Sequence, residues 1–480
     1  MLFNSLAYLV FLPVVFSLYW LVSKEYRWLV VLVASYCFYM FSVPAYGLII
    51  LGITIVSYVS AMMIDKTPDK RKRKSILIAS IVVCIGTLIF FKYMGFVGNT
   101  VNSFASVLGM ETDLLSIKII LPVGISFYTF QTMSYVIDVY RGLVASEKHF
   151  GKFAAFIAFF PQLVAGPIER TSNLLPQIKY PPEFSYDKAI SGVKLMIWGY
   201  YKKLMIADFL SPYVQKVYGG PYTYDGFALV VATIFFAIQI YCDFSGYSDI
   251  AIGTAKLFGI DLMTNFRSPY FSKSVREFWS RWHISLSTWF RDYVYIPLGG
   301  NRVSRTRHCI NLMVTFLVSG LWHGADWSFV LWGAIHGAAQ VIETGFHNRK
   351  EKPTGKIVTV IKVLLVFIFT TFAWIFFVAN SIEDAIYVIT HQFNGISLPV
   401  SYLTNGFTTL GLVSVYDIVI IGIGLTILFI YDRLSVREDL IKRIGHRFPV
   451  SQWLFYLILG MIIVLFSQKG VPAEFIYFQF

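Results

Sequence analysis

The sequence predicts an all-α, polytopic membrane protein, and three observations carry that prediction. Hydrophobic residues make up 56% of the 480 residues and charged residues only 14%, whereas soluble domains carry roughly 25% charged residues. The mean hydropathy is +0.64. Apolar runs long enough for a spanning helix, about 20 residues, recur from one end of the chain to the other. From these runs we expect about 10 to 12 membrane crossings.

The apolar runs fall into two classes by length. Four runs are short or interrupted, and we expect them to be buried or re-entrant, because such pieces are tolerated at membrane depth only inside protein or beside a water-filled cavity. They are 153–168, 245–260, 310–321 and 327–343. The longer runs are candidate crossings: 5–22, 28–43, 46–64, 76–97, 119–138, 189–207, 226–244, 357–379, 415–431 and 453–467. No stretch resembles a soluble domain, so we treat residues 1–480 as one integral membrane domain.

The formal charge of +13 is concentrated in short loops between apolar runs. Segment 65–75 has six basic residues and two acidic ones, which marks it as cytoplasmic by the positive-inside rule. Counting back three helices puts the N-terminus outside. Loops 349–356 and 433–447 are also basic and expected inside, whereas 380–414 has no Lys or Arg and is expected outside. This pattern explains the charge better than a nucleic-acid partner, which we do not expect.

Four cysteines are scattered along the chain without the spacing of a metal site or a disulfide framework: Cys37, Cys84, Cys242 and Cys309. A cysteine nucleophile is therefore not expected. The histidines also lack the i,i+4 spacing of a helical zinc pair, and no carboxylate–cysteine set completes a site. We expect no bound metal.

Two histidines that lie within hydrophobic, membrane-type segments are the best indication of a catalytic site. His283 lies in Arg-Trp-His (281–283), and His323 lies in Trp-His-Gly (322–324). An ionisable group is costly in lipid, so its presence there suggests a functional site. Histidine titrates near physiological pH, which suits it to general acid–base work.

The segment around His283, residues 272–300, has the 3.6-residue period of a helix. One face would be polar: Arg276, Ser280, His283, Ser287 and Arg291. A second face would be aromatic and apolar: Phe278, Trp282, Leu286, Trp289 and Tyr293. Glu277 and Arg281 are spaced for an i,i+4 ion pair, and Ser272 or Ser274 could cap the start. The helix would lie at the cytoplasmic boundary, facing a polar cavity; a simple interfacial aromatic-belt helix is the alternative.

The surroundings of His323 predict a turn near the middle of the membrane. Residues 301–309 carry three arginines and should be cytoplasmic, as should loop 349–356, so the chain between them must enter and return. The turn falls at residues 323–326. The entering run, 310–321, has 12 residues, which is too short to cross a bilayer at about 1.5 Å per residue. His323 should therefore lie inside the protein near mid-membrane.

The residues that flank His323 suggest how the turn is built. Gly324 would let a ligand approach the backbone closely, and Trp322 and Trp327 would provide apolar walls. Asp326 could orient His323 or cap the next helix, and we favour the cap because no Gly-x-Ser-x-Gly elbow accompanies a triad. We interpret His336 as a hydrogen-bonded core histidine.

At these residues the chain closely resembles the membrane-bound O-acyltransferase family, in particular its bacterial alginate O-acetyltransferase branch. The matching stretches are LPVGISFYTFQ (121–131), FPQLVAGPIER (160–170), CDFSGYSD (242–249), REFWSRWHISLS (276–287), LWHGA (321–325) and the closing FIYFQF (475–480). Their order, with His283 and His323 at the family's separation, makes the resemblance specific along almost the whole length.

The resemblance implies a fold: a ring of about eleven transmembrane helices with re-entrant segments and a thinned central catalytic region, where a cytoplasmic tunnel meets an outer funnel. Residues 266–343 would be the catalytic core segment. His323 matches the family's catalytic histidine, and His283 matches the second signature position. The location implied is the bacterial cytoplasmic membrane, in contact with its lipid.

The resemblance also implies the reaction. An acetyl group would leave a cytoplasmic thioester, acetyl-CoA, which binds as a substrate and not as a permanent cofactor. It would reach hydroxyls of an extracytoplasmic polysaccharide, directly or through an SGNH-type (serine-esterase-like) acetyltransferase partner. His323 would act as base or carry the acyl group, and His283 would orient the carbonyl or stabilise the oxyanion. Candidates for gripping the phosphates of coenzyme A are Arg276, Arg281, Arg291 and Arg302, and Trp282, Trp289 and Trp322 would line the acyl tunnel.

Three alternatives remain. A glycan or lipid transporter fits the broken helices, but we see no internal repeat. A D-alanyl transferase of teichoic acid, fed by a carrier protein, would use the same fold with another donor. An inactive scaffold would have little reason to keep His283 and His323.

Overall fold

The computed structural model describes residues 1–41, 43–109, 121–164, 166–346, 355–436, 449–466 and 475–476. These residues form helices and connecting turns, without a strand among them. The chain forms two compact units, one of residues 1–196 and 250–263 and the other of residues 197–249 and 264–480. The predicted catalytic core segment, 266–343, lies wholly in the second unit.

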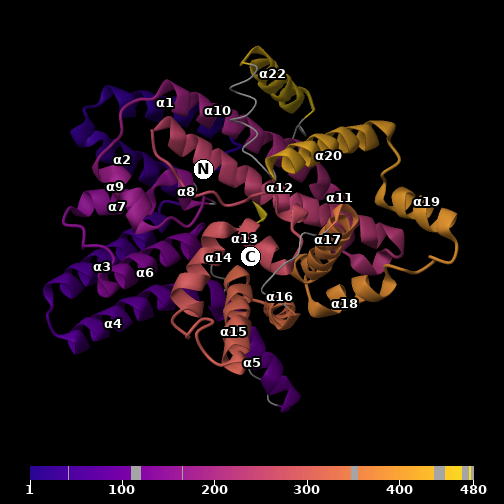
Figure 1. The fold of residues 1–480 in the computed structure, drawn as a ribbon, viewed down its shortest axis with the longest axis horizontal. Helices are drawn as coiled ribbons and strands as arrows, with labels where there is room; N and C mark the ends of the chain where they lie inside the picture. The colour runs from indigo at the N-terminus through magenta and orange to yellow at the C-terminus, as the bar shows by residue number, and fades with distance from the viewer. Residues whose placement is uncertain are drawn as a thin grey trace. The chain divides into compact units, whose positions relative to one another are not determined.

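The first unit is built from helices that pack around α6 (Ile125–Arg141), which contacts α3, α4 and α7 (Figure 1). Its other elements are α1 (Leu6–Leu21), η1 (Lys24–Tyr26), α2 (Arg27–Met40), α3 (Tyr46–Lys66), α4 (Lys70–Leu88), η2 (Ile89–Tyr93), α5 (Met94–Val107), α7 (Phe150–Ala158), α8 (Phe160–Leu163) and α9 (Thr171–Lys179). Helices α10 (Tyr186–Tyr200) and α12 (Phe227–Leu257) contribute residues to both units.

Two of the sequence motifs meet in the core of the first unit. Gln162 Nε2 donates to Gln131 Oε1 at 2.8 Å, and Gln131 Nε2 donates to the Phe156 carbonyl at 3.0 Å. Gly124 has a φ of +75°, and a Cβ added there would lie 2.4 Å from the Leu163 carbonyl oxygen. Glycine is therefore required where α6 begins against α8. These hydrogen bonds give buried amide groups partners inside the protein, as buried polar groups require.

The second unit contains the segment with both candidate histidines. Its elements are η3 (Tyr201–Ala207), α11 (Asp208–Tyr218), η4 (Pro221–Thr223), η5 (Pro269–Phe271), α13 (Val275–Arg281), α14 (Ile284–Phe290), η6 (Arg291–Tyr295), α15 (Arg305–His323), α16 (Trp327–Phe346), α17 (Lys356–Val378), α18 (Ile382–His391), α19 (Pro399–Leu410), α20 (Val415–Ser435) and α22 (Pro449–Phe466).

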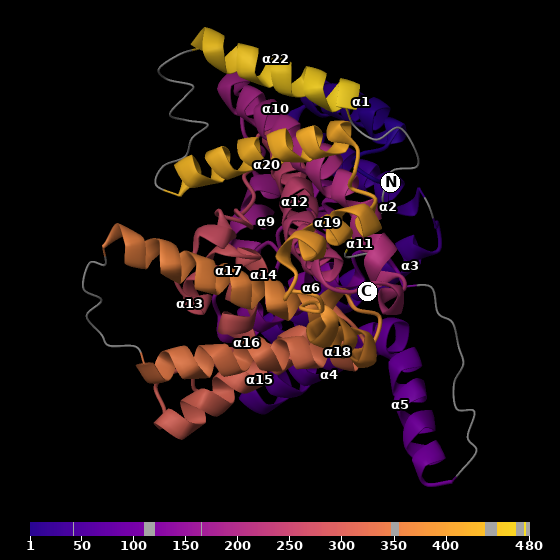
Figure 2. The same cartoon turned by 90° about the vertical axis from the view of Figure 1, so that its right-hand side faces the viewer.

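Helices α15 and α16 form a tight antiparallel hairpin, which Figure 2 shows side by side. Glycines let the two backbones approach closely, as small residues do between helices in membranes. A Cβ on Gly320 would lie 2.2 Å from the Phe329 carbonyl oxygen, and one on Gly333 would lie 2.4 Å from the Phe316 carbonyl oxygen. The hairpin turn, residues 324–326, follows directly after His323, as the sequence predicts. The helix that enters it is longer than the predicted run of 12 residues, because α15 has 19 residues, so its length does not by itself place His323 near mid-membrane.

Within the described residues, five helical stretches are long and apolar enough to cross a membrane, judged by length and composition. They are Tyr46–Lys66, Lys70–Ser106, Phe227–Leu257, Lys356–Val378 and Val415–Ser435, and each overlaps a predicted crossing. Two more, Leu6–Leu21 and Trp453–Leu465, are apolar but shorter. The chain is therefore a multi-pass helical membrane protein.

One of the short runs is not a separate piece. Residues 245–260 were expected to be buried or re-entrant on their own, but α12 continues through them to Leu257 as one helix of 31 residues. Most of this helix's apolar window is buried inside the protein. The polar residues that interrupt the hydrophobic pattern, among them Asp243 and Ser245, have partners there, so they do not end the helix.

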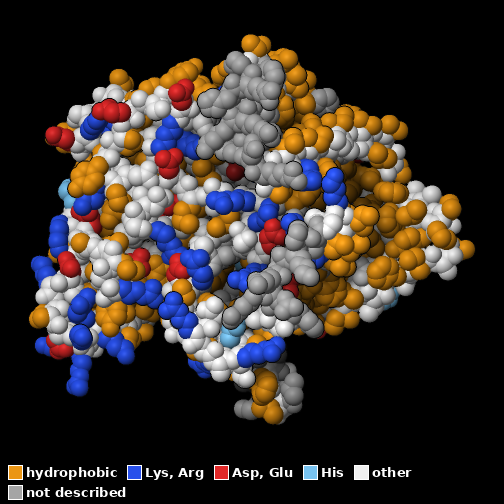
Figure 3. Space-filling view, viewed as in Figure 1, with side chains coloured by type: hydrophobic (Ala, Val, Ile, Leu, Met, Phe, Trp, Pro, Cys, Tyr) orange, Lys and Arg blue, Asp and Glu red, His pale blue; other side chains and the backbone are white. Residues whose placement is uncertain are grey.

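The surface over α17 to α20 is strongly apolar, as the broad hydrophobic region in Figure 3 shows. Leu364, Ile368 and Phe429 are each more than half exposed. Such a surface is expected where lipid, and not water, is the solvent. Most of the basic loops 349–356 and 433–447, and residues 477–480 of the closing motif, lie outside the described residues.

Glu169, in the loop between α8 and α9, is a buried carboxyl group of the first unit. It accepts hydrogen bonds from the Met263 amide and, at 2.7 Å, from Asn173 Nδ2. Its side chain is fully enclosed. Burial raises the pKa of Glu169 from 4.5 to about 7, against the opposing effect of these hydrogen bonds. The folded protein therefore holds a proton here that the unfolded chain loses near pH 4.5.

We predict that this proton makes stability pH-dependent. Because the folded state binds the extra proton, the free energy of unfolding should fall as pH rises from 4.5 through about 7. Glu169→Gln should remove that part of the slope. Thermal unfolding in detergent between pH 5 and 8 measures it, since detergent-solubilised protein can be titrated directly. Glu25→Gln, the same change at an exposed position, should leave the wild-type slope intact; an equal slope in Glu169→Gln would contradict the assignment.

Candidate active site

His283 lies at a break between two short helices. Helix α13 ends at Arg281, α14 begins at Ile284, and His283 has φ 42° and ψ 54°, in the left-handed region. The prediction of one continuous helix over 272–300 is therefore wrong at this point, and the predicted polar stripe does not run along a single helix. A left-handed conformation at a residue other than glycine costs about 1–3 kcal/mol, so neighbouring contacts must hold it.

Asn265 provides most of those contacts. Its carbonyl accepts from Ile284 N at 2.9 Å, and its Oδ1 accepts from Ser285 N at 3.3 Å and Ser285 Oγ at 3.0 Å. Its Nδ2 donates to Ser248 Oγ at 3.2 Å. A second backbone link joins Arg267 N to the Arg281 carbonyl at 2.9 Å. The extended segment before α13 thus clamps both sides of the break.

The start of α13 is held by hydrogen bonds from its own residues and from a residue of α16. Ser274 Oγ accepts from Glu277 N at 3.0 Å, and Glu277 Oε2 accepts from Lys273 N at 2.8 Å, which resembles a capping box except that the glutamate binds the residue before the cap. Ser274, and not Ser272, is therefore the cap. The predicted Glu277–Arg281 pair forms at 2.7 Å.

Glu343 of α16 completes this end of α13. Its two carboxylate oxygens accept from Val275 N at 2.6 Å and from Arg276 N at 2.9 Å. A carboxylate at a helix N-terminus is also favoured by the helix dipole. Glu343 thereby sets the direction in which Arg276 leaves the helix.

His323 is the last residue of α15 and the first residue of the predicted turn. Asp326 Oδ1 accepts from Ser328 N at 2.8 Å, which confirms it as the cap of α16. Gly324 does not leave room for a ligand, because a Cβ added there would lie 2.0 Å from Phe329 Cε2. The glycine instead accommodates the Phe329 ring.

Aromatic rings enclose both imidazoles. His323 is 3% exposed, and its ring centroid lies 5.0 Å from that of Trp322, 5.0 Å from Trp332 and 5.4 Å from Phe377. The expected wall from Trp327 is replaced by Trp332, since Trp327 is 53% exposed. His283 is fully buried, with Phe244 4.6 Å away, edge to face.

The fold brings the two predicted histidines together across 40 residues of sequence. Their ring centroids are 6.4 Å apart, and Trp322 lies beside both, 6.0 Å from His283. With reacting atoms about 3 Å from each ring, one carbonyl group can contact both imidazoles. Phe244, Trp332 and Phe377 complete the enclosure but have no distinguishing pattern in the sequence, where they look like ordinary core aromatics.

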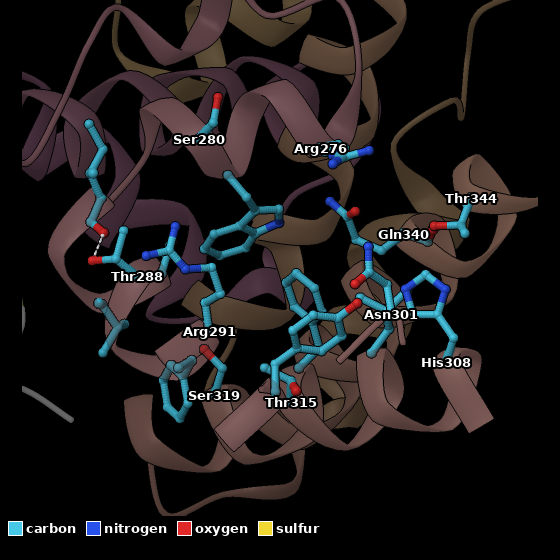
Figure 4. A pocket seen from close by; sticks show the side chains of 18 residues that line it. Arg276, Ser280, Thr288, Arg291, Asn301, His308, Thr315, Ser319, Gln340 and Thr344 are labelled. Atoms are coloured by element: carbon cyan, nitrogen blue, oxygen red, sulfur yellow. Dashed lines mark hydrogen bonds between the residues drawn. The ribbon is translucent and has the colours of Figure 1, made fainter. Parts of the chain in front are cut away.

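A pocket of about 810 Å³ lies beside this pair (Figure 4). Its lining includes Ile284, the residue after His283, and Ser319, one helical turn before His323. Arg276, Asn301, His308, Gln340 and Thr344 lie on one side, whereas Thr288, Arg291 and Ser319 lie on the other. The volume is within the range of about 300–1,000 Å³ that small-molecule sites occupy.

Two of the four predicted arginines, Arg276 and Arg291, line the pocket. Arg281 pairs with Glu277 and lies outside the lining, as does the exposed Arg302. Arg291 also has a carboxylate partner, Asp292 Oδ1 at 2.7 Å, but it lines the pocket. Sequence reasoning missed Asn301, His308, Gln340 and Thr344, which come from the loop before α15 and from the facing sides of α15 and α16. Single polar residues in a loop or on a helix are too common in the sequence for these four to stand out.

The predicted tunnel tryptophans lie around the pair and the pocket, although none of them lines the pocket itself. Trp322 touches both histidines, as described. Trp282 stacks on Phe278 at 5.4 Å and lies 5.0 Å from Trp374, and Trp289 lies 5.0 Å from Tyr293. Trp279 lines the pocket instead.

Trp279 also explains His336. Its Nε1 donates to His336 Nδ1 at 3.2 Å, inside a cluster of aromatic rings. His336 is therefore a buried, hydrogen-bonded core histidine, as interpreted from the sequence. Across the described ranges, no three His, Cys, Asp or Glu side chains come together as metal ligands.

Several known proteins are similar to this chain in sequence. The profile of the family described as "MBOAT, membrane-bound O-acyltransferase family" matches residues 143–383, which include both histidines. The "Probable alginate O-acetylase AlgI" of Pseudomonas aeruginosa is 39% identical over 80% of this chain and 73% of its own length. The "Peptidoglycan O-acetyltransferase" of Helicobacter pylori is 32% identical over 83% of this chain and 81% of its own.

A more distant group also matches. The "Teichoic acid D-alanyltransferase" of Streptococcus thermophilus is 29% identical over 48% of this chain and 58% of its own length. The long matches, the family profile and the paired histidines lead to one conclusion: this chain belongs to the membrane-bound O-acyltransferase family and is an O-acyltransferase.

Proposed function

We propose that the protein transfers an acetyl group from cytoplasmic acetyl-CoA toward hydroxyls of an extracytoplasmic polysaccharide. One observation carries this proposal: a pocket lies beside the histidine pair. Ile284, the residue after His283, is part of the wall of that pocket. Neither imidazole lines the pocket itself. A thioester bound there would point its carbonyl end past Ile284 and Ser319 toward the two rings, with Arg276 and Arg291 on opposite sides of its polar end.

The pocket chemistry suits coenzyme A as the carrier of the acyl group. Arg276 and Arg291 are two guanidinium groups on its wall, and guanidinium binds phosphate through paired, charge-assisted hydrogen bonds. Asn301, Gln340 and Thr344 offer polar partners for the amides of the pantetheine arm. Arg281 and Arg302, which lie outside the lining, are expected to contribute little.

The proposed chemistry needs only a base and an oriented carbonyl, because a thioester is already activated. His323 removes the proton of the acceptor hydroxyl, or first takes the acyl group and then passes it on. In either route the carbon–sulfur bond of the thioester breaks and a carbon–oxygen bond to the acceptor forms. Coenzyme A leaves as the thiol, with the proton that came from the hydroxyl. His283 orients the carbonyl or stabilises the oxyanion. Trp282, Trp289 and Trp322 keep the passage for the acyl group apolar.

The acceptor side rests on the relatives' names, which specify alginate and peptidoglycan. Both are glycans with free hydroxyls, so we propose an exported polysaccharide as acceptor, reached directly or through an SGNH-type acetyltransferase partner. The protein would span the bacterial cytoplasmic membrane with its N-terminus outside. The D-alanyl transferases match a smaller share of the chain, and a purified enzyme that accepts D-alanyl carrier protein but not acetyl-CoA would favour that donor.

We predict that His323→Ala abolishes transfer of acetyl from labelled acetyl-CoA. Loss of a base or nucleophile should lower kcat/KM by about 10³-fold or more, with the variant still folded in detergent. His336→Asn is the matched control, because it changes an equally buried histidine and keeps an acceptor for Trp279 Nε1. It should keep most of the activity, and near-normal transfer by His323→Ala would refute the assignment.

We predict that Arg276→Ala and Arg291→Ala each raise the KM for acetyl-CoA about tenfold or more, since hydrogen bonds to charged groups are worth about 1.5–3 kcal/mol. The effect should shrink with a dephosphorylated or truncated thioester, such as acetyl-pantetheine. Arg307→Ala removes an exposed arginine outside the pocket and should leave the KM unchanged. Equal KM values in all three variants would show that the donor binds elsewhere.

We predict that Asn265→Ala, which removes the side-chain hydrogen bonds to Ser285 and Ser248 but keeps the backbone hydrogen bond to Ile284 N, loosens the turn at His283 and lowers kcat about tenfold, with the KM for the donor little changed. Asn380→Ala is the control, because it removes another asparagine side-chain hydrogen bond, to the Tyr218 carbonyl at 2.9 Å. A folded Asn265→Ala enzyme with wild-type turnover would mean that the left-handed backbone does not govern the reaction.

A further inference from the structure

A group of buried charges joins η3, α11 and α12 in the second unit. Lys203 Nζ lies 2.5 Å from Asp243 Oδ1 and 2.8 Å from Asp208 Oδ1. Lys203 and Asp243 are each 1% exposed. Buried ion pairs are weak sources of stability, because the loss of hydration opposes the attraction. Lys203 also lies in a π-helical turn, a feature that often marks functional sites.

Asp243 has a second contact, on the side of the carboxylate that faces away from Lys203. Its Oδ2 accepts a hydrogen bond from the backbone N–H of Ile476 at 2.8 Å, across 233 residues of sequence. One carboxylate therefore bridges the Lys203 ammonium group and the C-terminal pair Phe475–Ile476. Charge-assisted hydrogen bonds to backbone N–H groups are short and directional, so this contact fixes the backbone at Ile476.

The residue next to Ile476 packs toward the histidine site. The Phe475 ring lies 4.6 Å from Tyr247 and 5.5 Å from Phe244. Phe244 follows Asp243 in sequence, and its ring lies 4.6 Å from that of His283. The hydrogen bond from Ile476 to Asp243 and the contact between the Phe475 and Phe244 rings thus lie side by side, and the Phe244 ring lies edge to face with that of His283.

We propose that Asp243 is a positioning residue that holds Phe475–Ile476 against Phe244 and so fixes the aromatic wall of His283. Lys203 orients the Asp243 carboxylate for this contact. The inference rests on the proposed function, in which His283 acts on the thioester carbonyl. It gives the buried charges a role beyond stability.

Asp243→Asn and Asp208→Asn form a matched pair of variants. Each removes one carboxylate charge from the same lysine, but only the amide introduced at position 243 faces both Lys203 and the Ile476 N–H. The single oxygen of that amide can accept from one of them, and its NH₂ group then opposes the other donor. The amide introduced at position 208 can turn its oxygen to Lys203 and keep that hydrogen bond.

We expect Asp243→Asn to lower kcat for acetyl transfer about tenfold, with the KM for acetyl-CoA little changed. Amide hydrogen exchange of the C-terminal peptide should become faster in the same variant. Asp208→Asn should match it in thermal stability or be less stable, yet retain kcat and slow exchange. A role limited to stability would move both variants together, which would overturn the proposal.

A second pair of variants changes the donor of the same hydrogen bond, the Ile476 N–H. Ile476→Pro removes the N–H donor, whereas Ile476→Ala keeps it and shortens the side chain. Ile476→Pro should reproduce the kcat loss of Asp243→Asn, and the double variant should be no worse than either single variant. Additive losses, or equal effects of Pro and Ala, would contradict the proposal. This pair also decides the question if Asp243→Asn fails to fold.

Including His323→Ala in the same experiments tests the proposed chemistry separately from the positioning role of Asp243. If His323→Ala keeps its activity, the proposed chemistry fails whatever Asp243 does. If His323→Ala is inactive and Asp243→Asn equals Asp208→Asn in kcat and in exchange, the positioning role alone is overturned.

Discussion

The left-handed backbone of His283 is the constraint on which the site depends. It ends α13 and starts α14 in a new direction, so that Trp282 packs into the aromatic core while Ile284 reaches the wall of the pocket. A straight helix would carry these residues around one axis. Asn265 maintains the break through its carbonyl and its amide oxygen, and this is how a local strain of about 1–3 kcal/mol persists in the folded state.

The second histidine depends on a different device, the close approach of α15 and α16. Gly320 and Gly333 remove the side chains that would keep the helices apart, and Gly324 admits the Phe329 ring at the turn. The hairpin is thereby rigid where His323 ends α15. Glu343, on the same hairpin, caps α13 and directs Arg276. One pair of helices therefore sets the position of His323 and helps to set that of Arg276 on one side of the pocket.

Local features were predictable from the sequence because they depend on neighbours in the chain. The turn after His323, the cap by Asp326 and the Glu277–Arg281 pair follow from short spacings, and the structure confirms each. The five helical stretches long enough to cross a membrane also coincide with predicted crossings, since hydrophobic length is a local property. The motif resemblance singled out His283 and His323 because both lie in short, ordered stretches that can be read along the chain.

The sequence by itself determined the helical membrane class, the family and the two histidines, because composition, hydrophobic length and motif order are all written along the chain. Only the tertiary structure decided that 272–300 breaks at His283, that α12 runs on through 245–260, and that Arg276 and Arg291 line the pocket while Arg281 does not. The break at His283 and the start of α13 depend on hydrogen bonds from outside the segment, made by Asn265 and Glu343. A 3.6-residue period cannot reveal them, because it describes one helix in isolation and not its partners.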